Sequence, residues 1–213
     1  MTTSKITFII PSIGRETLKD TMESLEKQTN PDWNAIIVFD GCSPNYETND
    51  MRIHIMQIEK TGHEKISAAG SVRNAAIRCA KTEWIAFVDD DDTLAHNYVE
   101  TLYQESAAEP SVDVIIFRMT HYGGVVPFLS TDTFYLGSVG ISFAMRLSVF
   151  QAGIEFVTDE GCEDYILLNR IREEKYKMMI SPFVRYFIRK QISQDEKDYY
   201  ANNNVVGNRV FIN

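Results

Sequence analysis

One stretch decides how this sequence folds: Trp84-Ile85-Ala86-Phe87-Val88-Asp89-Asp90-Asp91-Asp92. Its run of apolar residues predicts a strand that is buried on both faces, as in a parallel sheet. The adjacent carboxylates that follow repel one another, which is costly unless a cation or hydrogen-bond donors offset their charge. Mg²⁺ and Mn²⁺ bind such oxygens, usually together with the phosphates of a substrate. The stretch therefore indicates a buried strand that ends in a metal-binding acidic cluster.

The sequence around this stretch alternates between short apolar runs and amphipathic segments. We expect further strands at residues 6–10, 35–39, 52–58 and 112–119, the first of them stopped by Pro11. We expect helices at residues 17–28, 67–81 and 97–108. This alternation predicts an α/β fold with a Rossmann-like, mixed but mostly parallel sheet flanked by helices. Ligands of such sheets bind at the carboxyl ends of strands, so Pro11–Ser12, Asp40–Gly41 and Asp89–Asp92 should lie along one edge.

The second half of the chain has a less regular pattern. Residues 123–140 are expected to form irregular loops with at most a short strand, followed by a helix at 163–175 and a last strand at 183–188. We expect one domain over residues 1–213, with a nucleotide-binding half at 1–120 and an acceptor and catalytic half at 121–213. The chain has no clear terminator, which leaves open that this domain is a module of a longer protein with further domains.

Composition and charge exclude several classes of protein. The chain is 44% apolar and 24% charged, as is typical of a globular protein, and no apolar run approaches the roughly 20 residues of a membrane span. A net charge of −9 argues against nucleic-acid binding, which needs clustered Lys and Arg. Cys42, Cys79 and Cys162 are widely spaced and fit reduced thiols better than a disulfide framework. We therefore expect a cytoplasmic protein with no integral membrane segment and no nucleic-acid partner.

Five short segments resemble the motifs of one enzyme family, in that family's order and spacing. They are Ile9–Arg15, Ile36–Ser43, Gly70–Ile77, Phe87–Thr93 and Cys162–Leu167. The set resembles glycosyltransferase family 2, with Phe87–Thr93 in the place of its DXD region. Each motif alone is weak, but five in the right order are specific. The resemblance, which runs from residue 4 to 195, implies a GT-A fold and an enzyme that uses a nucleotide-sugar.

The resemblance assigns many polar residues to a donor site. The implied donor-binding residues are Pro11, Ser12, Arg15, Asp40, Arg73, Asp89 and Asp90. The first three would line the uracil and ribose side, and Asp89 would bind the ribose, or the metal through water. Asp40 would accept a hydrogen bond from the base N3–H, which cytidine lacks; capping of the turn at Gly41 is the simpler interpretation. Arg73 would reach the base or a phosphate, or would be an ordinary surface residue of its helix.

The acidic run is implied to hold the cofactor, Mn²⁺ or Mg²⁺. Asp91 is the implied direct ligand. The run allows the DXD frame to begin at Asp89 or at Asp90, and we prefer Asp89-x-Asp91. That frame leaves Asp92 for the following turn and helix start, where Asp is favoured.

The catalytic base is expected at the start of the helix at 163–175. An inverting transfer needs a carboxylate that takes the proton of the acceptor hydroxyl while its oxygen attacks the anomeric carbon. Asp164 is the candidate, because a helix N-terminus helps to keep a carboxylate ionised, and Glu163 is the alternative. Both residues also suit any first helical turn.

These features predict a metal-dependent glycosyltransferase. We expect it to move a hexose or deoxyhexose from a UDP-sugar, of the UDP-glucose or UDP-rhamnose class, to a hydroxyl of a glycan or other acceptor. An inverting mechanism is preferred, and a retaining one stays open. The alternatives are a catalytically silent nucleotide-sugar-binding module and a nucleotidyltransferase, although Ser12–Arg15 is too sparse for the Gly-rich basic loop of the latter. Many relatives carry a His where this sequence has Gln191, so Arg189 and Lys190 become candidates for the diphosphate.

Overall fold

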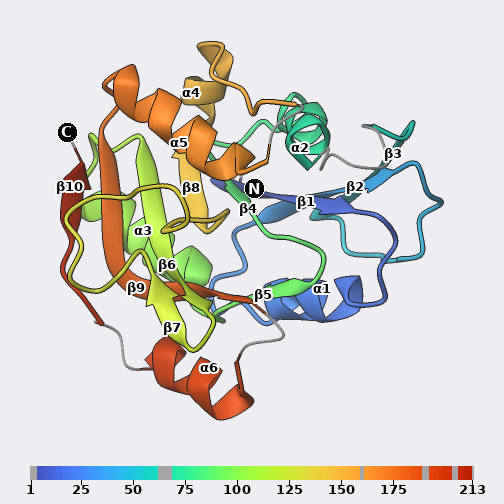
Figure 1. Cartoon of the computed structure of the whole chain (residues 1–213). Helices are drawn as coiled ribbons and strands as arrows, with labels where there is room; N and C mark the ends of the chain where they lie inside the picture. Colours follow the sequence, from blue (N-terminus) through green and yellow to red (C-terminus); the bar gives the residue numbers. More distant parts are fainter. Residues whose placement is uncertain (1–3, 62–68, 159–160, 189–191, 203–205, 213) are drawn as a thin grey trace.

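One mixed β-sheet runs through the molecule and carries helices on both sides (Figure 1). The structure is a computed structural model that describes residues 4–61, 69–158, 161–188, 192–202 and 206–212. Its strands are β1 (Ile6–Ser12), β2 (Asn34–Asp40), β3 (Ile53–Ile58), β4 (Trp84–Phe87), β5 (Asp92–Leu94), β6 (Val114–His121), β7 (Gly124–Val126), β8 (Phe143–Arg146), β9 (Met178–Ile188) and β10 (Val210–Ile212). Its helices are α1 (Leu18–Glu26), α2 (Ala69–Ile77), α3 (Tyr98–Ala108), α4 (Leu147–Gln151), α5 (Glu163–Glu173) and α6 (Gln194–Asn202).

The first half of the chain forms the parallel part of the sheet. Strands β3, β2, β1 and β4 lie side by side in this order, and each neighbouring pair is parallel. A strand in such a position is covered on both faces, which requires apolar residues along its whole length rather than at alternate positions. β1 and β4 meet that requirement, since Ile6, Phe8, Ile9 and Phe87 are all 0% exposed. The predicted α/β class is confirmed.

β1 continues through Pro11 to Ser12, so the prediction that Pro11 stops the first strand is wrong. Pro11 pairs with Val38 of β2, but on the other side β4 pairs no further than Ile9. The N–H that proline lacks would point to that second side, because Ile9, two residues earlier, accepts a hydrogen bond from Val88 there. The strand therefore loses no ladder hydrogen bond at Pro11.

The second half of the sheet is mixed because β8 runs against both of its neighbours. β8 lies between β4 and β6 and is antiparallel to each, whereas β6 and β9 are parallel. The sequence pattern does not predict β5, β8, α4, α6 or β10. Four of these elements are at most five residues long, which is too short for a periodic pattern of apolar residues to be recognised. The fifth, α6, lies in the polar tail. β9 also begins at Met178, five residues before the strand predicted at 183–188.

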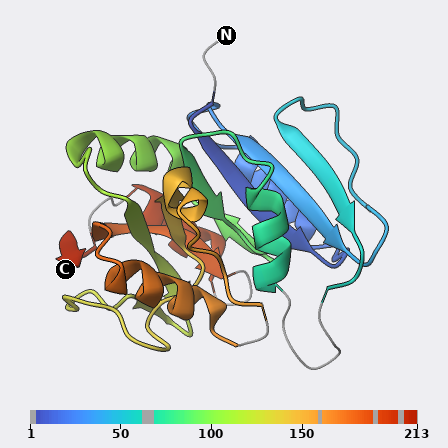
Figure 2. The ribbon, with the colours of Figure 1, turned by 90° about the horizontal axis from the view of Figure 1, so that it is seen from above.

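Helices cover the sheet in two groups. In Figure 1, α2, α4 and α5 lie above the sheet, and α1 and α6 lie below it. Figure 2 is seen from above, and α2, α4 and α5 are there nearest the viewer. Among the helices in the described ranges, none is both long and apolar enough to cross a bilayer.

The core anchors the strand that carries the acidic run. Trp84, in the strand predicted to be buried, and Trp33 are core residues, with 1% and 0% of their surface exposed. Phe8 of β1 contacts the rings of Trp33 and Tyr98 at centroid distances of 6.5 and 5.4 Å. Phe87, the last residue of β4, is fully buried as well. The turn that follows β4 is therefore held by a well-packed strand.

Candidate active site

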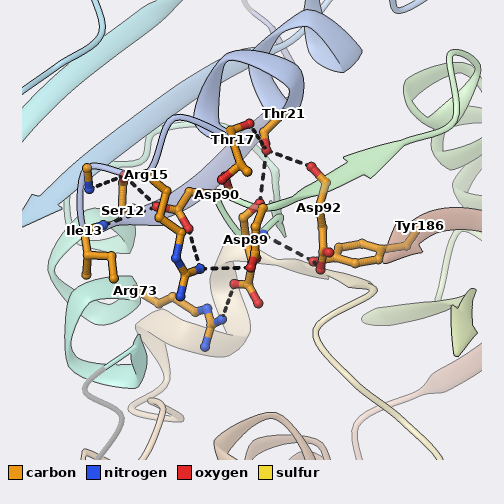
Figure 3. Close-up of polar contacts among 12 residues, drawn as sticks. Ser12, Ile13, Arg15, Thr17, Thr21, Arg73, Asp89, Asp90, Asp92 and Tyr186 are labelled. Atoms are coloured by element: carbon orange, nitrogen blue, oxygen red, sulfur yellow. Dashed lines mark hydrogen bonds and ion pairs between the residues drawn. The ribbon is translucent and has the colours of Figure 1, made fainter. Parts of the chain in front are cut away.

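The carboxyl ends of β1, β2 and β4 lie at one edge of the sheet, as predicted. β1 is parallel to both β2 and β4, so Ser12, Asp40 and Asp89 leave the sheet on the same side. Pro11, half-buried, lies just before this edge within β1. In the close-up, α1 (blue) and α2 (teal) stand on two sides of the acidic run (Figure 3). The topology thus gathers the predicted donor and metal residues in one place.

The four aspartates alternate between buried and partly exposed positions. Asp90 and Asp92 are 2% and 9% exposed. The side chains of Asp89 and Asp91 are 35% and 38% exposed. A β-turn produces this alternation, because the N–H of Asp92 donates to the carbonyl of Asp89 at 3.1 Å. Asp89 and Asp91 are therefore the two carboxylates of the run that a ligand can reach.

Asp90 is held by the loop after β1 (Figure 3). Its Oδ2 accepts hydrogen bonds from the Ser12 hydroxyl at 2.7 Å and from the Ile13 N–H at 3.2 Å. Its Oδ1 accepts from Arg15 at 2.9 Å, and Arg15 also pairs with Asp91 at 3.1 Å. Such donors stabilise ionised carboxylates, so the protein itself offsets part of the repulsion within the run. Both oxygens of Asp90 have partners, and its contact with the donor stays a prediction.

Asp92 is tied to β9 and α1. The prediction that it serves a helix start is wrong, because Asp92 opens β5 and α3 begins only at Tyr98. The Tyr186 hydroxyl donates to Asp92 Oδ2 at 2.8 Å and accepts from the Asp89 N–H at 3.2 Å. The Thr21 hydroxyl donates to the Asp92 carbonyl at 2.7 Å. The position of Asp92 follows from the pairing of β5 with β9, distant in sequence, which no local pattern reports.

Three hydroxyl residues of the site are absent from the sequence prediction. Besides Tyr186 and Thr21, Thr17 donates to the carbonyl of Asp90 at 2.7 Å. Burial, together with the charges of Asp89 and Asp92, raises the pKa of Tyr186 well above its usual value, so its hydroxyl stays protonated and can donate. Hydroxyl groups at ordinary helix and strand positions carry no signal in a single sequence.

Arg73 joins the acidic run to the start of α5. It is 2% exposed, and its two terminal nitrogens pair with Asp89 at 2.6 Å and with Glu163 at 2.7 Å. Burial acts to lower the pKa of Arg73, but the two carboxylates outweigh burial and raise it, so the guanidinium stays charged. The Nε of Arg73 is buried and has no hydrogen-bond partner among the described residues. The interpretation of Arg73 as an ordinary surface residue is wrong.

Asp164 lies in the first turn of α5, beside Glu163. Burial raises the pKa of Asp164 to about 6; the charges of Glu163 and Asp89 act in the same direction, and the Tyr165 N–H and Arg73 oppose it. The Tyr165 N–H donates to Asp164 Oδ1 at 2.7 Å. A carboxylate that titrates close to neutral pH has the property that a general base requires.

Asp40 ends β2 and binds the chain at residues 60–61. Its Oδ1 accepts from the N–H and the hydroxyl of Thr61, at 2.6 and 3.1 Å, and its Oδ2 accepts from Lys60 Nζ at 3.2 Å. Gly41 has a φ of +69°, and a Cβ there would lie 2.5 Å from the Cβ of Lys60, so the turn requires glycine. Asp40 thus has the turn-binding role, and its contact with a base stays a prediction.

The half-exposed aspartates fit a cation that is shared with a substrate. Within the described part of the chain, no three His, Cys, Asp or Glu side chains are grouped as a complete ligand set. Mg²⁺ and Mn²⁺, however, commonly take one or two carboxylates and complete their shell with phosphate oxygens and water. Asp89 and Asp91 can supply those carboxylates. Arg15, which pairs with both Asp90 and Asp91, is 45% exposed at its side chain. The predicted diphosphate contacts Arg189 and Lys190, and Gln191 in the place of the His of many relatives, lie outside the described residues.

The mixed, mostly parallel sheet with its flanking helices is the fold of the GT-A class, as predicted. TarS 1–349 of S. aureus, solved in complex with UDP-GlcNAc, shares this fold with a TM-score of 0.67 at 21% identity, over 95% of this chain and 62% of that one. A mannosyltransferase of Pyrobaculum calidifontis, PcManGT, solved in complex with GDP-Man and Mn²⁺, has a TM-score of 0.61 at 15% identity, over 89% of this chain and 57% of that one.

The sequence itself shows the family. The family model of glycosyl transferase family 2 matches residues 7–175, and the chain belongs to this family. Glycosyltransferase GlyG of Streptococcus pneumoniae serotype 4 (strain TIGR4) is 30% identical over 136 residues, which are 61% of this chain and 42% of GlyG. The chain thus matches less than half the length of this curated relative.

Proposed function

We propose that this chain is a metal-dependent, inverting glycosyltransferase that moves a hexose or deoxyhexose from a UDP-sugar to an acceptor hydroxyl. The observation that carries the proposal is the ion-pair bridge of Arg73. Its guanidinium links Asp89, on the donor side, to Glu163, the neighbour of Asp164. A donor site and a candidate base are therefore held together by one buried side chain.

The donor would lie along the edge formed by β1, β2 and β4. Asp40 Oδ1 is used by Thr61, so Oδ2 is the atom that would accept the N3–H of uracil. Lys60, which pairs with Oδ2, has a side chain that is 62% exposed and can move aside. The solved complex of TarS with UDP-GlcNAc, on the same fold, supports a UDP-sugar donor. UDP-glucose and UDP-rhamnose are the donors we propose to test first.

Asp89 and Asp91 would hold the cation and the diphosphate. A bound Mn²⁺ or Mg²⁺ supplies positive charge to the departing diphosphate. Asp91 serves as the direct ligand, and Asp89 binds the ribose or the cation through water, while Arg73 keeps Asp89 in place.

Asp164 would act as the general base. The acceptor oxygen attacks the anomeric carbon, the bond from that carbon to the phosphate oxygen breaks, and UDP leaves with the bonding electrons. The hydroxyl proton passes to the Asp164 carboxylate, which is ionised above its pKa of about 6. The acceptor, a glycan or another hydroxyl compound, would approach from the side of residues 121–213. We place this reaction in the cytoplasm.

A panel of nucleotide-sugars tests the donor class. A ligand at 100 times its Kd stabilises the native state by about 2.7 kcal/mol, which corresponds to a rise in Tm of roughly 5–10 °C for a domain of this size. We expect this rise with UDP-sugars in the presence of Mn²⁺ or Mg²⁺, and a smaller rise without the metal. Equal shifts with GDP-sugars, or none with any UDP compound, would contradict the proposed donor. A UDP-sugar that binds but is never transferred would indicate a silent binding module.

A further inference from the structure

The hydroxyl of Tyr186 contacts both ends of the acidic turn. It donates to the carboxylate of Asp92 at 2.8 Å and accepts from the N–H of Asp89 at 3.2 Å (Figure 3). Tyr186 itself is fully buried in β9, on a different part of the chain from the turn. A buried hydroxyl is costly unless its donor and acceptor functions are both used, and here both are used on the turn.

A second buried tyrosine lacks such contacts, so burial of a tyrosine does not by itself produce them. Tyr98 in α3 is also 0% exposed, and its hydroxyl has no hydrogen-bond partner among the described residues. Its ring contributes packing against Phe8 and Phe117. The fold therefore contains one buried tyrosine whose hydroxyl is bonded to the acidic turn and one whose hydroxyl is not.

We propose that Tyr186 is a positioning residue that sets which aspartates of the run face the metal and the diphosphate. Its bond to Asp92 keeps that carboxylate inside the protein, and its bond to the Asp89 N–H fixes the first residue of the turn. With both ends of the turn fixed, Asp90 points inward to the loop after β1, and Asp91 points outward. This inference rests on the proposed function, because it concerns the same metal and diphosphate.

Without the Tyr186 hydroxyl, the acidic run would no longer favour Asp89 and Asp91 as the pair that faces the metal. Asp92 would lose the Tyr186 donor in a position that is 9% exposed, so its carboxylate would be held less firmly and would turn more readily towards solvent or towards a cation. The frame Asp90-x-Asp92 would then compete with Asp89-x-Asp91. Tyr186 would thus act through the aspartates and touch neither the metal nor the donor.

The test compares Y186F with Y98F, two variants that each remove one buried hydroxyl and keep the ring. Calorimetric titration of Mn²⁺ into protein saturated with UDP gives the metal affinity, and Tm and far-UV circular dichroism report the fold. We expect Y186F to weaken Mn²⁺ binding about tenfold, the lower end of the loss seen when a metal site loses an outer hydrogen-bond partner. We expect Y98F to bind Mn²⁺ like the wild type, with an unchanged or higher Tm.

Each outcome bears on a different proposal. Equal Mn²⁺ affinity in Y186F and the wild type overturns the role of Tyr186 and leaves the proposed function intact. No Mn²⁺ binding by the UDP-bound wild type overturns the proposed function and this inference together. If Y186F does not fold, D92N decides: its amide oxygen still accepts from Tyr186, so we expect Mn²⁺ affinity within about twofold of the wild type. A large loss in D92N would make Asp92 a ligand and contradict the inference.

Discussion

The acidic turn after β4 and the first turn of α5 both present carboxylates, but they control them by opposite means. In the acidic turn, the buried Asp90 accepts hydrogen bonds from the loop after β1, and Asp92 accepts one from Tyr186. In α5, burial raises the pKa of Asp164 to about 6. Hydrogen-bond donors orient the carboxylates of the acidic turn, whereas desolvation makes the Asp164 carboxylate more basic.

Under the proposed function, this difference would give the two regions separate tasks. A site that binds a cation needs carboxylates in a fixed geometry, and the turn obtains that geometry from α1, β9 and the loop after β1. A general base needs a proton affinity near the working pH, which the environment of Asp164 provides. Arg73 connects the two regions, because it binds Asp89 in one and Glu163 in the other.

The largest expected effect comes from removing the candidate general base in α5. In D164N, the amide cannot take the acceptor proton, and kcat should fall by about 10³, within the range of 10²–10⁴ for loss of a general base. The KM for the UDP-sugar should change little, because the acidic turn is untouched. Steady-state kinetics on both substrates measure this. The matched variant E163Q should keep kcat within about tenfold of the wild-type value. If instead E163Q loses the activity and D164N keeps it, Glu163 is the base.

The next effect concerns the bridge between the regions. R73M leaves the carboxylates of Asp89 and Glu163 without their cation, and we expect a loss of about 2 kcal/mol in the free energy of unfolding. This is less than the 3–5 kcal/mol of a fully buried pair, because the Asp89 side chain is 35% exposed. R78M is the control, since Arg78 pairs with Glu155 at the surface, and it should cost less than about 0.5 kcal/mol. If chemical denaturation gives R73M and R78M equal losses in the free energy of unfolding, Arg73 is no structural bridge.

A third effect concerns the raised pKa of Asp164. The folded-state pKa of Asp164, about 6, lies above the usual value of 3.8 for an aspartate, so between these values the folded state binds more protons than the unfolded state. Stability from this group is therefore present at low pH and lost as the pH rises through 6. D164N should have a higher Tm than the wild type at pH 7.5, with the difference vanishing near pH 4. A lower Tm of D164N at pH 7.5 would mean that Asp164 is not destabilised by burial.

The first half of the fold could be predicted because each buried parallel strand is a continuous apolar run. Residues 84–87 and 34–40 carry that signal, and polar residues directly after them mark the edge of the sheet. The second half could not be predicted to the same extent. Strands such as β5 and β8 are three and four residues long, and distant partners hold them in place.

The same limit applies to the site. Asp91 and Asp164 are conspicuous in the sequence because Asp91 follows an apolar strand and Asp164 opens a helix, whereas Arg73, in the middle of α2, is indicated only by the family resemblance of its segment. The environment of Asp92 depends on Tyr186, which lies 94 positions away in the chain, and that contact exists only once β5 and β9 pair. Local patterns therefore indicate which residues gather, and long-range pairing decides which of them face outward.

The frame of the acidic run can be measured directly by titrating Mn²⁺ into UDP-saturated wild type and D91N. Asp91 is the outward carboxylate at the centre of the turn, with a side chain that is 38% exposed. We expect D91N to lose more than about 100-fold in Mn²⁺ affinity, beyond the loss caused by an outer partner, while its Tm without ligands stays near that of the wild type. Mn²⁺ binding by D91N at wild-type affinity would contradict the assignment of Asp89 and Asp91 as the residues that serve the donor.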